Sequence, residues 1–159
     1  MKITAVDIYD VAMGFGWNPI LLRVLTDEGI EGVGEVSLAY GAGSLAAVGM
    51  LRQLAERYLL GADPMRIEDM WNRLFRGTFW GQGGGPVLYG AMSGIDAALW
   101  DIKGKAYGVP VYELMGGKVN DKLRVYANGW YVTMTSRERR TCDAPEEYAQ
   151  EALRVVGDG

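Results

Sequence analysis

Histidine is absent from this 159-residue sequence, and cysteine occurs only at Cys142. The lack of histidine excludes histidine metal ligands, Ser-His-Asp triads and imidazole acid–base pairs from the chain. A single cysteine excludes an internal disulfide and a cysteine-rich zinc site. Acid–base chemistry on these residues would therefore depend on lysines and carboxylates, and no lysine stands in an obviously desolvated position.

Long apolar runs and an excess of positive charge are also missing. No apolar run approaches the roughly 20 residues of a membrane span, and Asp7 and Asp10 stand where a signal peptide would be apolar. The 16 Lys and Arg against 20 Asp and Glu give a net charge of −4. This balance argues against nucleic-acid binding, because neutralising phosphates requires a basic face. We therefore expect a cytoplasmic protein with neither a membrane nor a nucleic acid as partner.

Glycine, by contrast, is abundant, with 23 residues, about twice its usual frequency of roughly 7%. The alternation of apolar and polar residues predicts a three-stranded antiparallel meander, with strands near 3–12, 19–27 and 30–36. Glycine-rich loops at 14–19 and 37–43 would leave the same end of this meander. Both carry aromatic residues, which are harder to explain as core than aromatics on a helix face.

Apolar periodicity predicts helices near 44–59, 64–77, 86–107, 111–115 and 145–156. Ser44 and Asp63 are the expected N-caps of the first two. The third is the strongest signal, and it is typical of a buried core helix. Its apolar stripe consists of Leu88, Met92, Ile95, Leu99, Ile102 and Ala106. Asp101 and Lys105 are expected to pair on its outer side.

A different pattern follows residue 117, with a strand predicted at 123–127, a polar loop at 128–144 and then the last helix. A parallel strand needs a bonded neighbour, and an apolar helix face needs a sheet to cover. The sequence therefore predicts that the polypeptide continues beyond residue 159. Composition and periodicity alone indicate an α+β domain with an aromatic, glycine-rich rim, followed by the beginning of a β/α domain, and they reveal no reaction.

Other candidate motifs have simpler structural explanations. Asp96 and Asp101 lie roughly 140° apart around one helix, so they cannot share a metal ion. The loop 81–86 lacks the Lys and Ser/Thr of a phosphate-binding loop and is better explained as a tight turn. The basic run 137–140 could meet a substrate carboxylate, although a solvated loop is the favoured interpretation.

Two segments resemble the enolase superfamily, and more narrowly the mandelate racemase/muconate lactonizing enzyme group. They are AMSGIDAALWDIKGK at 91–105 and GVPVYELMGG at 108–117. Gly-Val-Gly-Glu at 32–35 and Gly-Ala-Asp-Pro at 61–64 precede them in the same order. Phe79, Gly-Gly-Pro at 84–86 and the Asp-Lys pair at 121–122 are similar to acid-sugar dehydratases of the galactonate dehydratase type.

The resemblance implies an α+β capping domain over residues 1–118 and the start of a modified (β/α)₈ TIM barrel over 122–159. It also implies a lyase that dehydrates an aldonate or aldarate to a 2-keto-3-deoxy acid. In such enzymes a base removes the proton α to the carboxylate, Mg²⁺ stabilises the enediolate, and a β-hydroxyl leaves. The group carries its acid–base residues and Mg²⁺ ligands on later barrel strands, so neither maps onto residues 1–159. A small acid-sugar substrate and a homo-oligomer are further implications.

Four residues are expected to face this substrate: Trp17 and Tyr40 from the capping loops, and Asn128 and Trp130 at the mouth of the first barrel strand. Ordinary loop packing is the alternative for each. Two other functions remain open. One is a racemase, epimerase or cycloisomerase of the same superfamily, and the other is a non-catalytic binding or oligomerisation module that reuses the capping fold.

Overall fold

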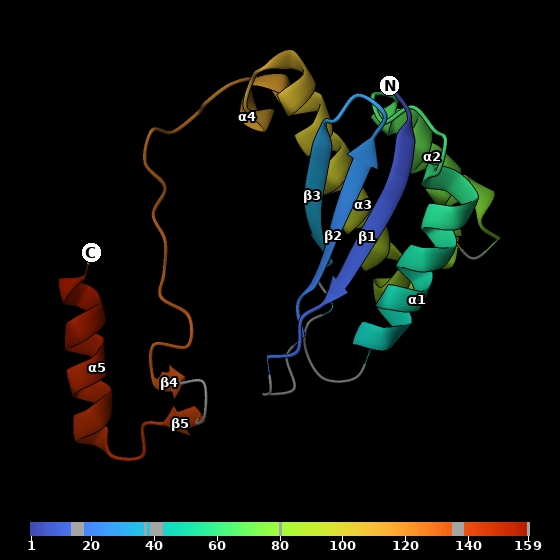
Figure 1. Cartoon of the computed structure of the whole chain (residues 1–159). Helices are drawn as coiled ribbons and strands as arrows, with labels where there is room; N and C mark the ends of the chain where they lie inside the picture. Colours follow the sequence, from blue (N-terminus) through green and yellow to red (C-terminus); the bar gives the residue numbers. More distant parts are fainter. Residues whose placement is uncertain (14–17, 37, 39–42, 80, 135–138, 159) are drawn as a thin grey trace. The chain divides into compact units, whose positions relative to one another are not determined.

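The computed structural model describes residues 1–13, 18–36, 38, 43–79, 81–134 and 139–158, which fall into two compact units, Met1–Lys118 and Val119–Gly159. The first unit opens with the strands β1 (Ile3–Asp10), β2 (Ile20–Thr26) and β3 (Glu31–Val36). The helical elements that follow are α1 (Ser44–Leu54), the π-helical segment η1 (Ala55–Leu59), α2 (Ile67–Gly77), the 3₁₀ turn η2 (Gly81–Gly83), α3 (Gly85–Tyr107) and α4 (Val111–Leu114). The helices α1 and α3 cover one face of the sheet, and α2 packs against α3 (Figure 1). This is the predicted α+β architecture.

The sheet is an antiparallel meander in the order β1-β2-β3. Alternate residues of β2 explain why it forms, since Ile20, Leu22 and Val24 are buried under the helices while the residues between them face away. The turn between β2 and β3 requires Gly29, whose φ of 76° is disfavoured for residues with a Cβ. The three predicted strands are confirmed, each slightly shorter than expected.

The apolar stripe of α3 is the centre of the core, as its periodicity predicts. Its five largest members are buried, and Ala106 is half-buried. The backbone of α3 lies unusually close to β3, because glycines form the contact. A Cβ on Gly34 would lie 2.0 Å from the carbonyl oxygen of Gly94, and one on Gly32 would lie 2.1 Å from that of Ala98. Part of the glycine surplus therefore permits a strand and a helix to touch backbone to backbone.

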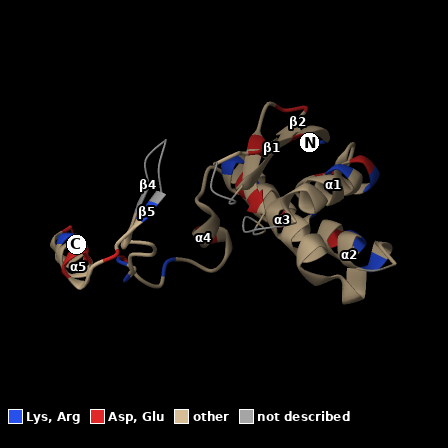
Figure 2. Ribbon diagram, turned by 90° about the horizontal axis from the view of Figure 1, so that it is seen from below, with Lys and Arg blue, Asp and Glu red and all other residues tan. Residues whose placement is uncertain are grey.

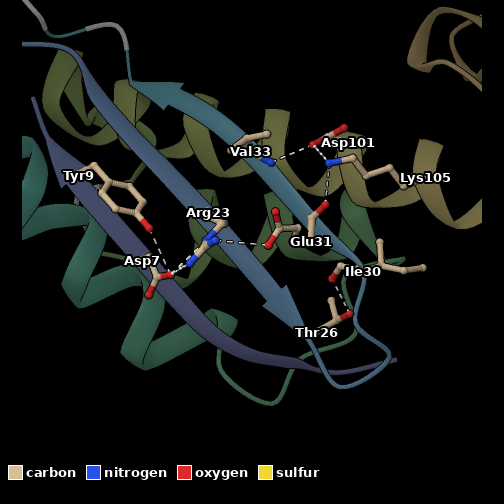
Figure 3. A network of polar contacts seen from close by, with 9 residues as sticks. All are labelled: Asp7, Tyr9, Arg23, Thr26, Ile30, Glu31, Val33, Asp101 and Lys105. Atoms are coloured by element: carbon tan, nitrogen blue, oxygen red, sulfur yellow. Dashed lines mark hydrogen bonds and ion pairs between the residues drawn. The ribbon is translucent and has the colours of Figure 1, made fainter.

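Asp101 and Lys105 form the predicted ion pair, with Nζ 2.7 Å from Oδ2. The pair also fastens α3 to the edge of the sheet (Figure 3). The Val33 amide donates to Asp101 Oδ2 at 2.9 Å, and Lys105 Nζ donates to the Glu31 carbonyl at 2.8 Å. Because β3 is an edge strand, these contacts satisfy backbone groups that could otherwise pair with another chain.

Replacing Asp101 by alanine should lower the free energy of unfolding by about 1 kcal/mol, because the Val33 amide and Lys105 lose their acceptor. Asp101→Asn keeps an acceptor for the amide and should lose less. Urea denaturation checks both variants, and hydrogen exchange at the Val33 amide should accelerate in the alanine variant only. Equal exchange in the two variants would contradict this role of the carboxylate.

The two expected N-caps are wrong. Gly43 is the N-cap of α1 and Ser44 its first residue, while α2 begins at Ile67 after the N-cap Arg66. Asp63 instead closes a turn, because its Oδ1 accepts the Met65 amide at 2.9 Å and its carbonyl accepts the Arg66 amide at 3.3 Å. An Asp-Pro pair satisfies a turn as readily as a helix start, so the sequence signal was ambiguous.

The helix predicted at 44–59 ends in a π-helical turn rather than continuing regularly. The Leu60 amide donates to the Ala55 carbonyl at 3.1 Å, an i to i−5 bond. The next residues form hydrogen bonds with Ile3, the first residue of β1. The Gly61 amide donates to the Ile3 carbonyl at 2.8 Å, and the Ile3 amide donates to the Ala62 carbonyl at 2.9 Å. The π turn thus brings this segment beside β1.

The second unit contains a hairpin, β4 (Val132–Met134) and β5 (Arg139–Thr141), followed by α5 (Pro145–Gly157). The helix was predicted, but the hairpin lies where a polar loop was expected. The strand predicted at 123–127 is absent, and Leu123 and Val125 are 77% and 85% exposed. No strand in the described part of the unit lies beside this segment, and an extended backbone without hydrogen-bonded neighbours is not a sheet strand.

Candidate functional site

Two of the four predicted substrate-facing residues, Trp17 and Tyr40, lie outside the described residues. Their placement toward a substrate stays a prediction. The other two lie in the second unit, on either side of Gly129, which has a φ of 69°. Asn128 is exposed, and its amide makes no hydrogen bond within the described part of the chain. Its role toward a substrate therefore stays a prediction.

Trp130 is half-buried in a cluster of three aromatic rings. Its centroid lies 5.6 Å from that of Tyr131 and 6.2 Å from that of Tyr148, both in edge-to-face geometry, and Tyr131 stacks on Tyr148 at 6.3 Å. Since Tyr148 belongs to α5, the cluster holds the two residues that precede the hairpin to the helix. The sequence places Tyr148 on the apolar face of its helix but does not indicate that a loop tryptophan would pack there.

The basic run at 137–140 is described only at its end. The guanidinium of Arg140 pairs with Glu147 of α5. Glu147 also accepts the Asp143 amide at 3.0 Å, and this backbone hydrogen bond, with the help of Arg140, lowers the pKa of the Glu147 carboxyl. The arrangement resembles a capping box that satisfies the start of α5, so Arg140 has a structural partner.

No group of three or more His, Cys, Asp or Glu side chains in the described ranges is placed to hold a metal ion. Asp101 is engaged by Val33 and Lys105, and Asp96 lies apart from it on α3. Mg²⁺ requires near-octahedral oxygen ligands, usually with one or two carboxylates directed at it. The described residues therefore do not fit a Mg²⁺ site, and we derive no reaction step from them through that ion.

Asp96 is a half-buried carboxylate on α3, and its pKa is shifted from the ordinary value. Burial raises the pKa of its carboxyl, the negative charge of Glu68 raises it further, and a hydrogen bond with Trp100 partly opposes both. A raised pKa in the folded state means that the charged form is less favourable there than in the unfolded chain. Asp96 therefore contributes to stability at acidic pH, and this contribution is lost as the pH rises through the folded-state pKa.

Asp96→Asn should make the chain more stable than wild type at pH 7, because the variant carries no charge to desolvate. The difference should shrink as the pH falls and vanish below the ordinary value of 3.8. Urea denaturation of both proteins between pH 3.5 and pH 7 measures it. A wild type that is the more stable at pH 7 would contradict the assignment.

The described helices carry charged side chains of both signs. In both α2 and α5 the Asp and Glu residues lie toward the N-terminal end and the Arg residues toward the C-terminal end, as the helix dipole favours (Figure 2). In the ranges that the structure describes, no helix is both long and apolar enough to cross a bilayer.

The meander, the helices on one of its faces and the close α3–β3 contact define the first unit as an enolase-type capping domain. The chain belongs to the mandelate racemase/muconate lactonizing enzyme family, since the profile of that family's N-terminal domain matches residues 17–116. The matched range ends close to the boundary of the first unit at Lys118.

Several relatives are similar over most of the chain. A D-galactonate dehydratase of Ralstonia nicotianae is 46% identical over 127 residues, which are 80% of this chain and 31% of the relative. A solved enolase-superfamily member from Salmonella Typhimurium is 50% identical, with a TM-score of 0.87 over 99% of this chain and 40% of its own. A solved enolase from Pantoea ananatis with bound D-gluconate and Mg is 40% identical, with a TM-score of 0.67 over 76% of this chain and 28% of its own. The chain thus spans about a third of the length of these relatives.

Proposed function

We propose that this chain is the capping part of an acid-sugar dehydratase, a hydro-lyase acting on an aldonate or aldarate. A base removes the proton α to the carboxylate, and the β-hydroxyl then leaves as water, so that the acid sugar yields a 2-keto-3-deoxy acid and water. The observation that carries this proposal is the 46% identity to a D-galactonate dehydratase across 80% of the chain. The Pantoea enolase with D-gluconate bound supports the same substrate class.

We propose further that residues 122–159 begin a TIM barrel whose remaining strands supply the acid–base groups and the Mg²⁺ ligands. Several apolar side chains of the second unit are exposed. They support this proposal, because extensive exposed apolar surface usually contacts another part of a protein. Besides Leu123 and Val125, the residues Val119, Leu153 and Val156 are largely exposed. The first unit would close over the barrel and exclude water from the substrate.

Asn128 is our candidate for a substrate hydroxyl. In the complete enzyme, Asn128→Ala should lower kcat/KM about tenfold, equivalent to about 1.4 kcal/mol, because one hydrogen bond to the substrate is lost. The melting temperature should hardly change, since the side chain is exposed and makes no hydrogen bond to any residue that the structure describes. Asn120→Ala, which removes another exposed asparagine of the same unit, is the control and should change neither quantity. A large fall in the melting temperature of the Asn128 variant would instead make this residue structural.

The reaction itself is tested by incubating the complete enzyme with Mg²⁺ and a panel of aldonic and aldaric acids. Release of 2-keto-3-deoxy acids supports dehydration. Exchange of the α-proton with solvent deuterium, without such products, would favour a racemase or epimerase of the same superfamily. The proposal includes a homo-oligomer in the cytoplasm, and light scattering on the purified enzyme measures the assembly.

A further inference from the structure

A groove of about 250 Å³ lies among α1, η1, the end of α2 and the start of α3. These elements can be followed in Figure 1. Its lining includes the apolar side chains of Met50, Leu54 and Leu88 and the aromatic rings of Tyr58 and Phe79. The groove is distinct from the predicted rim residues, and the proposed dehydration makes no use of it.

The lining of the groove also carries polar side chains from successive turns of one helical stretch. Gln53 and Arg57 stand four residues apart, so they project on the same side. Both are exposed, and neither side chain has an ion pair or hydrogen bond within the described residues. Within the part of the chain that the structure describes, the lining of the groove therefore combines an unpaired guanidinium and an unpaired amide with apolar side chains.

The Tyr58 ring is held in place by contacts with α2. The Tyr58 hydroxyl donates to the Gly77 carbonyl at 3.1 Å, and the guanidinium carbon of Arg73 lies 5.9 Å from the centroid of the Tyr58 ring. The π-helical turn η1 contains both Arg57 and Tyr58, and such turns often occur at functional sites. The groove thus combines an exposed cation with an anchored tyrosine ring.

From this arrangement we propose that the groove binds a small organic carboxylate with an apolar tail. The carboxylate pairs with Arg57 and accepts from the Gln53 amide, while the tail lies on Met50, Leu54 and Leu88. An acid sugar does not suit this site, because its hydroxyls would lose water against the apolar side chains of the lining, which offer no hydrogen bonds. The site therefore selects a ligand class different from that of the proposed reaction.

Hexanoate is the probe for this site, titrated into the ¹⁵N-labelled 159-residue chain and followed by amide NMR shifts. We expect saturable shifts at Gln53, Arg57 and Gly77, with a Kd of about 1 mM for so small a ligand. Acetate lacks the tail and hexan-1-ol lacks the charge, so each should bind at least about tenfold more weakly. D-galactonate should cause no shifts at these positions.

Arg57→Gln removes the charge at an exposed position and should weaken hexanoate about tenfold. The matched control is Arg52→Gln, which changes an exposed arginine of α1 that lies beside β1 and outside the groove. It should leave the affinity unchanged. Equal weakening by both variants, equal binding of hexan-1-ol, or no saturable shifts would overturn the proposal. So would concentration-dependent shifts at Gly77 without ligand, since they would show that a second copy of the chain occupies the groove.

Discussion

Gly34→Ala should lower the free energy of unfolding of the first unit by about 3 kcal/mol. The new Cβ would stand 2.0 Å from the carbonyl oxygen of Gly94 and 2.9 Å from its carbon, and both atoms belong to the backbone of α3. A flexible side chain could move aside, but a helix backbone cannot, so α3 would have to separate from β3. Urea denaturation followed by circular dichroism should show the midpoint falling by roughly 1.5 M.

Gly49→Ala is the matched control for this substitution. Gly49 lies within α1, and a Cβ there would meet no atom within 4 Å. Alanine should therefore stabilise the protein by about 0.5–1 kcal/mol through its greater helix propensity. If the two substitutions gave the same stability, the backbone contact between α3 and β3 would not exist in solution.

Leu99→Ala should lower the free energy of unfolding by about 3 kcal/mol, because it leaves a cavity beneath the sheet. Leu99 is 1% exposed and lies in the apolar stripe of α3, where the neighbouring backbone cannot collapse to fill the space. The change should appear as a lower urea midpoint with an unchanged slope.

Leu45→Ala provides the comparison, since Leu45 is 76% exposed on α1. Removing its side chain should change the free energy of unfolding by no more than about 0.5 kcal/mol. Similar losses for the two leucines would mean that α3 is not the centre of the core.

The sequence predicts the first unit well because periodic burial leaves a periodic pattern. The stripe of α3 and the alternation in β2 indicate their elements directly. The distance between two elements leaves no such pattern. Gly32 and Gly34 fit an ordinary strand alternation, and only the structure reveals that the carbonyls of Ala98 and Gly94 occupy the space of a side chain.

The second unit is less predictable because its strands depend on neighbours. The segment 123–127 has strand-forming residues, but its backbone has no paired strand in the described part of the unit. The hairpin of β4 and β5 was missed for the opposite reason. Its pairing joins Val132 to Thr141 across a polar stretch that resembles a loop.

The functional features, like the fold, could be predicted from the sequence only in part. Local motifs at 91–105 and 108–117 suffice to indicate the family, which the profile match confirms. The groove beside Arg57 could not be predicted, because its lining comes from α1, η1, α2 and α3 and its character depends on which cation lacks a partner. The substrate contacts of Asn128 and Trp130 stay predictions.

The mass of the native polypeptide tests most directly whether residues 1–118 cap a larger catalytic domain. Intact mass spectrometry of the protein isolated from its source organism provides this value. Our proposal predicts a mass more than twice the 17.4 kDa of the present chain. A native mass near 17.4 kDa would contradict it and would favour a self-standing binding module.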